Sequence, residues 1–183
     1  MKWKRRKRRK SSRPILTQEP SLIRQCQPQD VQDIYVIVND AAVVYRGVIP
    51  DDCYHEPYMP LYELEKEMKQ MVFFGWQDGG QLVGVMGFQP LGEVALIRHA
   101  YVLNGWQRQG IGSRLLNHLI KLTKTGRLLV GTWAEAHWAV RFYKKHGFQL
   151  LPNKDELLRA YWQIPDRQIE TSVVLGRDLS QWA

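Results

Sequence analysis

Apolar and polar residues recur along this chain with two different periods, and the period indicates the type of element. Apolar residues three or four positions apart are typical of helices. This spacing starts after Pro28 and reaches Tyr45, recurs over residues 61–71, and returns after Gly110 in a helix that we expect to end before Gly126. The last of these helices has its apolar residues at Ile111, Leu115, Leu116, Leu119, Ile120 and Leu122.

Short runs rich in β-branched and aromatic residues predict the strands. The first spans residues 21–27, and the next two, 72–76 and 82–89, flank a hairpin turn made by Gln77-Asp78-Gly79-Gly80. Further strands are expected at 93–103, 128–133 and 169–175, and a helix at 153–163. Antiparallel hairpins followed by a strand, loop, helix and strand predict an α+β fold, with a mixed, mostly antiparallel sheet and helices on both faces.

The segment Gln107-Arg108-Gln109-Gly110-Ile111-Gly112 lies between an expected strand and an expected helix. Two closely spaced glycines let consecutive backbone N–H groups converge, and the helix N-terminus behind them adds roughly half a positive charge. This combination predicts a site for a diphosphate.

Two common phosphate-binding motifs do not fit this loop. A dinucleotide fingerprint needs a third glycine three residues after the second, where this chain has Leu115. A nucleotide P-loop needs Gly-Lys-Ser/Thr, but Gly112 is followed by Ser113 and Arg114.

Length and charge indicate one domain with a basic extension. The chain has 183 residues, 44% of them hydrophobic, and a formal net charge of +8. Residues 2–13 hold nine Lys or Arg and no acid, leaving 17 basic and 18 acidic residues in the remainder. We therefore divide the chain into a basic, disordered arm at 1–20 and a domain at 21–183. The arm has two interpretations. Residues 2–13 make weak contact with a nucleic acid, or the arm is a solvated leader with no specific partner.

The two cysteines, Cys26 and Cys53, lack the density of a disulfide framework, which favours a reducing, cytoplasmic setting. No apolar run approaches the length of a membrane span. Neither observation suggests a secreted or membrane-embedded protein.

The glycine loop resembles the Gln/Arg-x-x-Gly-x-Gly/Ala motif of the GNAT family, the acetyl-CoA-dependent N-acetyltransferases, at Gln107, Gly110 and Gly112. A second segment, Ala139 to Phe148, is similar to the Ala-x-x-Phe-Tyr-x-x-x-Gly-Phe pattern of that family. We expect Phe142 to lie in the core, Tyr143 to face the groove and Gly147 to end the helix in a left-handed conformation.

The resemblance implies a sheet whose fourth and fifth strands splay apart, with acetyl-CoA bound as co-substrate between them. It also implies transfer of the acetyl group to a primary amine, by direct attack in a ternary complex, and a homodimer as is common for acetyltransferases of this kind. By the same resemblance the residues that bind the coenzyme are Ala100, Tyr101, Val102, Gln107, Arg108, Gln109, Gly110, Ile111, Gly112, Ser113 and Tyr143.

The resemblance also suggests catalytic groups. The backbone N–H of Val102 would stabilise the oxyanion, and Tyr143 would protonate the leaving thiolate. The general base stays open, because the position where some members carry a strand glutamate is Leu96 here. Alternatives are water and the side chains of Glu93, His99, Asp52, His55 and Glu56.

The acceptor is expected to bind against the loop at residues 46–60, whose acids would attract a cationic amine. Candidate acceptor-binding residues are Tyr45, Asp52, Tyr54, His55 and Glu56, with Tyr58 as a further wall. The pair His55-Glu56 begins like a zinc-binding helix, but Met59 stands where the second histidine would be and prolines interrupt the helix, so no metal is expected.

Two other classes of function are compatible with the sequence. One is a nucleic-acid-associated protein that uses the basic arm, and the other is an acyl-CoA sensor without catalysis. The acceptor amine cannot be identified from the residues alone.

Overall fold

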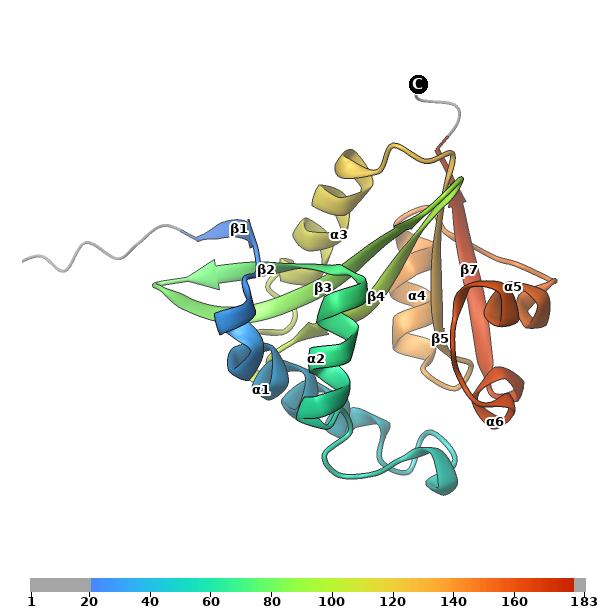
Figure 1. Cartoon of the computed structure of the whole chain (residues 1–183), viewed down its shortest axis with the longest axis horizontal. Helices are drawn as coiled ribbons and strands as arrows, with labels where there is room; N and C mark the ends of the chain where they lie inside the picture. Colours follow the sequence, from blue (N-terminus) through green and yellow to red (C-terminus); the bar gives the residue numbers. More distant parts are fainter. Residues whose placement is uncertain (1–20, 180–183) are drawn as a thin grey trace, which may run out of the picture.

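The computed structural model of the chain describes residues 21–179, which form one mixed sheet of seven strands (Figure 1). The strand order is β1-β2-β3-β4-β5-β7-β6. Neighbouring strands are antiparallel except for β4 and β5, which are parallel. The strands are β1 (Leu22–Gln25), β2 (Val72–Asp78), β3 (Gln81–Leu91), β4 (Val94–Val102), β5 (Arg127–Trp133), β6 (Gln149–Leu150) and β7 (Ser172–Asp178).

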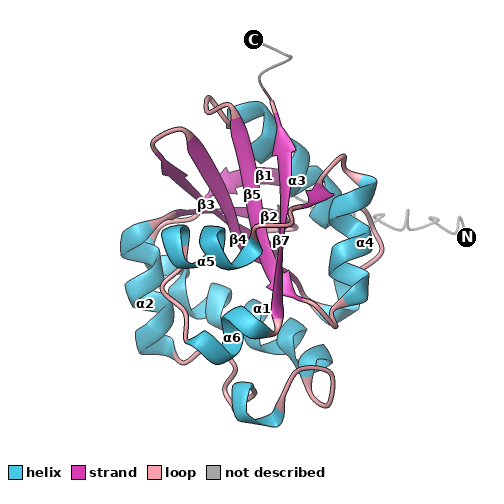
Figure 2. Cartoon of the chain, turned by 90° about the vertical axis from the view of Figure 1, so that its right-hand side faces the viewer, coloured by secondary structure: helices cyan, strands magenta, loops and turns pink. Residues whose placement is uncertain are grey.

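Helices cover both faces of the sheet. In Figure 2, α4 lies to the right of the sheet and α2 to its left, and α5 lies in front of the strands. The residues of α3 and α4 pack on one face and those of α5 on the other. The α-helices are α1 (Val31–Ala42), α2 (Leu61–Gln70), α3 (Ile111–Leu122), α4 (His137–Lys145), α5 (Lys154–Tyr161) and α6 (Asp166–Glu170). Short 3-10 turns precede or follow them at η1 (Pro28–Asp30), η2 (Val43–Tyr45), η3 (Asp51–Cys53) and η4 (Asn104–Trp106).

The core follows from alternation along the two parallel strands, since successive side chains of a strand point to opposite faces. On one face, Ala95, Ile97, Leu128 and Val130 pack with the buried residues of α3 and α4. On the other, Val94, Leu96 and Leu129 pack with Leu157, Leu158 and Trp162 around α5. Because both faces of β4 and β5 are buried, these strands form the rigid centre on which the site is built.

The predicted fold class and most predicted elements are confirmed, and one boundary is wrong. The third helix ends at Leu122, before Gly126 as expected, because Thr123 is extended and its N–H and hydroxyl both donate to the Leu119 carbonyl. The strand expected at 169–175 begins only at Ser172, because Ile169 belongs to α6 and packs into the cluster around α5. The basic arm expected at 1–20 lies outside the described residues.

No helix within residues 21–179 combines the length and the apolar composition needed to cross a membrane.

The connection between β1 and α1 is fixed by a buried carboxylate. Asp30, 7% exposed, accepts two hydrogen bonds from the Arg24 guanidinium at 2.7 and 2.8 Å and one from the Gln27 N–H at 2.6 Å. The hydrogen bonds from Arg24 lower the pKa of Asp30 below its ordinary value, despite the opposing effect of burial. Asp30 therefore joins the edge strand to the first helix.

We expect Asp30→Asn to lower the free energy of unfolding by about 1–3 kcal/mol, because Arg24 and the Gln27 N–H lose a charged acceptor. A carboxyl whose pKa is depressed in the folded state stabilises above its unfolded pKa, about 3.9, and this stabilisation is lost as pH falls. Urea unfolding at pH 7 and at pH 3 measures both effects, and the difference from wild type should shrink at pH 3. Glu65→Gln, on the exposed side of α2, serves as the control. Equal losses at both pH values would contradict the assignment.

Candidate functional site

The two parallel strands at the centre of the sheet separate halfway along their length. Pairing between β4 and β5 runs from Val94 with Arg127 to Ile97 with Val130 and stops there. Beyond this point β5 continues to pair with β7 as far as Trp133, and β4 continues to pair with β3 as far as Val102. The facing backbone edges of residues 98–102 and 131–133 therefore do not pair with each other, as the resemblance implied, and the opening between them is called the cleft below.

An extra residue in β4 causes the separation. Val85 pairs with Tyr101 and Gly87 with Arg98, so His99 and Ala100 together oppose the single residue Met86. Such a bulge bends the strand and increases its twist. His99 adopts a φ of 48°, a left-handed conformation that is uncommon for a residue other than glycine. The bend turns the second half of β4 away from β5.

The bulge also decides which backbone groups face the cleft. The N–H of Leu103 donates to the Val83 carbonyl at 2.9 Å, so these two residues form a hydrogen-bonded pair. Because such pairs alternate with open pairs in antiparallel strands, the backbone N–H and C=O of Val102 point away from β3 and toward the cleft, whereas those of Tyr101 point toward β3. Among the coenzyme-binding candidates of this strand, Val102 thus presents a backbone donor, and Tyr101 does not.

The glycine loop begins α3 in the manner that the sequence predicted. Gly110 caps the helix with a φ of 81°, and Arg108 also has a positive φ, of 63°. The first N–H groups of a helix have no intrahelical acceptor, and here they belong to Ile111, Gly112 and Ser113. A Cβ on Gly112 would meet the Phe142 ring at 3.6 Å, so this residue lies against that ring.

Side-chain hydrogen bonds hold the loop between β4 and α3 in place. Gln107 donates through Nε2 to the Val102 carbonyl at 3.1 Å and to Oδ1 of Asn104 at 3.0 Å. Asn104 is in turn tied to Asp40 of α1 through its backbone N–H and its amide. The Gln107 side chain is thus used to fix the loop. Gln109, further along, makes a weak contact with the Gly105 carbonyl at 3.5 Å.

Two adjacent aromatic residues of α4 are placed differently from the prediction. Tyr143, 5% exposed, belongs to the main core cluster and contacts the Phe148 ring edge-on at 5.6 Å between centroids. Phe142 is only partly buried and lies beside Gly112. Burial raises the pKa of the Tyr143 phenol, so this group stays protonated near neutral pH and has a proton to donate. Gly147 is left-handed with a φ of 82°, as predicted.

A group of aromatic hydroxyls lies where the loop 46–60 meets the open ends of β4 and β5. The Trp133 indole N–H donates to the Tyr58 hydroxyl at 2.9 Å. The Tyr45 and Tyr58 rings are 5.3 Å apart. The loop is therefore held against the end of β5.

His99 lies under α2, next to two charged groups. Its Nε2 is 2.9 Å from a carboxylate oxygen of Glu67, which also binds the Arg98 guanidinium at 2.9 Å. Burial and the neighbouring Arg98 lower the pKa of His99 below its ordinary value, although Glu67 acts in the opposite direction, so the ring is neutral at pH 7. Burial alone would raise the pKa of Glu67. The hydrogen bond with His99 and the charges of His99 and Arg98 outweigh burial, so the pKa of Glu67 lies below its ordinary value. Nothing in the sequence pattern identifies Glu67 as a partner.

The structure does not bring Glu93 to the other candidates. This residue is exposed in the turn that precedes β4. The strand that follows Glu93 has nine residues, Val94–Val102, at about 3.3 Å each. Glu93 therefore lies at the opposite end of β4 from the cleft.

The remaining acceptor candidates all lie on the loop at residues 46–60, and most are paired. Glu56 is bound by the Arg46 guanidinium and the Tyr54 hydroxyl. Asp52 accepts from Nε of Arg167 in α6 at 3.0 Å. His55 contacts the Pro57 carbonyl through Nδ1 at 2.7 Å. These residues lie on the predicted loop, but the carboxylates of Glu56 and Asp52 are already paired with groups of the same chain.

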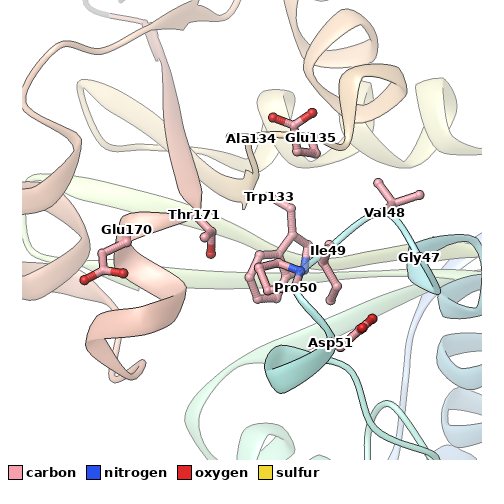
Figure 3. Close-up of a pocket in the computed structure, with 10 residues that line it drawn as sticks. All are labelled: Gly47, Val48, Ile49, Pro50, Asp51, Trp133, Ala134, Glu135, Glu170 and Thr171. Atoms are coloured by element: carbon pink, nitrogen blue, oxygen red, sulfur yellow. The ribbon is translucent and has the colours of Figure 1, made fainter.

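A pocket of about 520 Å³ opens beside this loop (Figure 3). Three segments line it, the loop itself, the end of β5 and the junction of α6 with β7. Figure 3 shows Ile49 and Pro50 against the Trp133 ring, with Thr171 on one side and the carboxylates of Asp51 and Glu135 toward the edges. The sequence pattern did not indicate Glu135, Glu170 or Thr171, because their contribution depends on the path of α6.

These features together define an acetyltransferase fold, and comparison with known families agrees. Residues 34–148 match the model of the Acetyltransferase (GNAT) family. The chain belongs to this family, which uses acetyl-CoA.

Solved structures of this family have the same fold at low sequence identity. The PaiA N-acetyltransferase of Thermoplasma acidophilum, in complex with coenzyme A, is similar with a TM-score of 0.68 and 15% identity, over 87% of this chain and 99% of that one. The ribosomal-protein-S18-alanine N-acetyltransferase of Escherichia coli has a TM-score of 0.63 and 17% identity, over 87% of this chain and 94% of that one. Ard1 of Thermoplasma volcanium has a TM-score of 0.65 and 18% identity, over 87% of this chain and 98% of that one.

The chain's own residues suit acetyl-CoA. The start of α3 offers N–H groups and a positive dipole end, which favour a diphosphate. Val102 packs against the core cluster that contains Tyr143, beside the point where β4 and β5 separate. A coenzyme with a diphosphate suits this helix start.

We expect Gly112→Val to weaken coenzyme A binding at least about tenfold, or about 1.4 kcal/mol, because its side chain would occupy the space beside the N–H groups of α3. Titration calorimetry measures the affinity, and circular dichroism checks that the protein remains folded. Gly126→Val, beyond the other end of α3, is the matched control, since a Cβ there meets nothing within 4 Å. Undiminished affinity in a folded Gly112→Val protein would show that the diphosphate lies elsewhere.

Proposed function

We propose that this protein is an N-acetyltransferase that moves the acetyl group of acetyl-CoA to a primary amine of a small molecule or protein, by direct attack in a ternary complex. The observation that carries the proposal is the cleft between β4 and β5, with the left-handed start of α3 at one end and the pocket of the loop 46–60 at the other. One ligand on each side of the reacting centre is the arrangement that direct transfer requires.

Backbone and side-chain donors support the transfer step. Bound acetyl-CoA supplies an activated acetyl group. The Val102 N–H, which points into the cleft, stabilises the negative charge that develops on the acetyl oxygen, and a single such donor is worth roughly 3 kcal/mol. Tyr143, protonated and buried beside the cleft, gives its proton to the departing sulfur.

The charge around the pocket favours a cationic acceptor. The loop and the pocket lining carry the five carboxylates Asp51, Asp52, Glu56, Glu135 and Glu170, against the guanidinium of Arg46 in the loop and that of Arg167 beside it. A protonated amine would be drawn to this excess of negative charge. The names of the similar structures, which are N-acetyltransferases, agree with an amine as acceptor.

The test is release of free thiol from acetyl-CoA when the purified protein is offered amino acids, polyamines, aminoglycosides and peptide N-termini in turn. We expect release with at least one class of amine, and we expect Tyr143→Phe to lower kcat by about 10²- to 10⁴-fold, because an acid group is lost. Coenzyme A affinity of the variant should be unchanged. A protein that binds coenzyme A but acetylates no amine would be a sensor, and the proposal would be wrong.

We also propose His99 as the base that takes the proton of the amine. Glu67 accepts the proton of Nε2, which fixes the tautomer and leaves the Nδ1 lone pair free. The lowered pKa of His99 keeps the ring neutral at pH 7, as a base must be. Glu67 would then be a positioning residue.

The pH dependence of kcat/KM tests this role. With His99 as base, the rate should fall as pH falls, because the ring becomes protonated, and the midpoint should lie below the ordinary histidine value of about 6.5. In His99→Gln this acid limb should disappear, and the rate at pH 7 should drop by about 10²-fold or more. Glu67→Gln should shift the limb without abolishing it. An unchanged profile in His99→Gln would assign the proton to water.

A further inference from the structure

Positive charge in the folded domain is concentrated in one stretch of the chain. Residues 104–150 hold eight Lys or Arg and one acid, Glu135, whereas residues 21–103 and 151–179 together hold nine Lys or Arg and 16 acids. The charges of the domain therefore nearly balance overall but are strongly segregated. Nothing in the transfer mechanism above uses the cations of α3 and α4.

Six of these cations are exposed on α3, on α4 and just after α3, and none of the six forms an ion pair with a residue of 21–179. We call them the basic face. They are Arg114, Lys121, Lys124, Arg141, Lys144 and Lys145. Because their charges are not neutralised within the described chain, the face is electrostatically favourable to an anion.

The two helices lie side by side on the same side of the sheet. Leu115, Leu116 and Leu119 of α3 share the main core cluster with Tyr143 of α4. The apolar sides of both helices are thus used in the core, and their cations are left on the outside.

Both helices also end toward the same end of the sheet, which is the end of β7. The Leu179 N–H donates to the carbonyl of Gly126, after α3, at 2.8 Å. Two residues earlier, the Arg177 guanidinium donates to the carbonyl of His146, after α4, at 2.8 Å. The cations in the last turns of α3 and α4 therefore gather at one end of the molecule.

This end is far from the cleft. The strand β5 begins there, at Arg127, which faces Asp178, and it ends beside the cleft at Trp133. Along α3, ten residues separate Ile111 from Lys121, which corresponds to about 15 Å. A diphosphate held at the start of α3 would therefore leave the cations near its end uncovered.

The composition of the basic face favours phosphate groups over a membrane or an acidic protein. A helix that binds a membrane surface inserts its apolar side, but the apolar sides of α3 and α4 are buried in the core. Protein interfaces are depleted in lysine and have an apolar centre. The exposed large apolar side chains of these two helices are Leu122 and Trp138.

Aromatic rings among the cations favour a single strand over a duplex. The Arg114 guanidinium lies 5.0 Å from the centroid of the Trp76 ring in β2. Trp138, which is 37% exposed, lies one turn before Arg141 on α4. The bases of a single strand can stack on such rings, whereas those of a duplex are already stacked on each other.

The basic segment at residues 2–13 joins the domain near this face. It precedes β1, in which Ile23 pairs with Trp76, the residue whose ring lies beneath Arg114. Charges of the same sign repel, so this segment is not a favourable cover for the face. An anionic strand can instead contact both sets of cations.

We propose that the basic face binds the phosphate backbone of a single-stranded nucleic acid, with the segment at residues 2–13 adding further phosphate contacts. The bound strand lies over α3 and α4 and leaves the cleft between β4 and β5 free. This inference goes beyond the proposed acetyltransferase function and does not depend on it.

Charge-reversing variants of the full-length protein test the proposal. Fluorescence anisotropy of a labelled single-stranded oligouridylate measures the affinity at several salt concentrations. We expect Lys121→Glu with Lys124→Glu to weaken binding at least about tenfold in low salt and to reduce the slope of log Kd against log salt concentration by about 1.4, or 0.7 for each lost contact. Lys144→Glu with Lys145→Glu should have a similar effect, and circular dichroism checks that both proteins remain folded.

The matched control changes the net charge equally on the other side of the sheet. Lys66→Glu with Lys69→Glu alters two exposed lysines of α2, a helix that packs beside Phe73, whereas Phe74 packs in the cluster of α3. This variant should bind the oligouridylate within about twofold of wild type. An equal loss in the control would overturn the proposal, because net charge alone would then explain binding. Unchanged affinity in both variants of the basic face would also overturn it.

Competing ligands separate this site from the coenzyme site and from other anionic partners. Saturating coenzyme A should leave the oligouridylate bound, and its displacement would assign the cations to the coenzyme and overturn the proposal. Tighter binding to duplex DNA, to polyglutamate or to vesicles of phosphatidylcholine and phosphatidylglycerol would overturn it in favour of that partner. Because no turnover is measured, a protein that binds the oligouridylate but acetylates no amine would contradict the acetyltransferase function alone.

Discussion

The structure depends on one extra residue in the central strand. Because His99 and Ala100 together face Met86, β4 cannot continue alongside β5, and each strand instead keeps its outer neighbour. The same irregularity turns the Val102 amide toward the opening and directs the chain into the loop that starts α3. The cleft, its backbone donor and the position of the start of α3 thus have a common origin in strand register. A central sheet buried on both faces holds this strained segment in place.

The charge that each part of the site favours differs, and this suits transfer from an anionic coenzyme to a cationic amine. Unpaired N–H groups and a helix dipole favour an anion at the start of α3. Next to the separated strands, Ala100 and Val102 pack against the cluster that contains the Tyr143 phenol, which burial keeps protonated and uncharged. Carboxylates predominate around the pocket at the far end, where a cation is favoured. An anionic coenzyme and a cationic acceptor would therefore approach the reacting centre from opposite sides, each repelled from the other's position.

The sequence predicted local features well and distant contacts poorly. The motif at Gln107, Gly110 and Gly112 and the period of α3 depend on neighbouring residues, and both agree with the structure. Which of Phe142 and Tyr143 faces the core depends on how α4 packs, and the order was reversed. The pairing of His99 with Glu67, and of Asp52 with Arg167, joins residues 32 and 115 positions apart, and no spacing rule indicates such pairs. The isolated position of Glu93 likewise became visible only from the path of β4.

The ion pair between Asp52 and Arg167 connects the loop 46–60 to α6, and both segments line the pocket beside that loop and lie outside β4, β5 and α3. Substitutions in either segment can therefore reshape this pocket while the bulge in β4, the start of α3 and Tyr143 stay as they are. Under the proposed function, the segments that would select the amine are thus separate from those that would carry out the transfer, so that either set could change without the other.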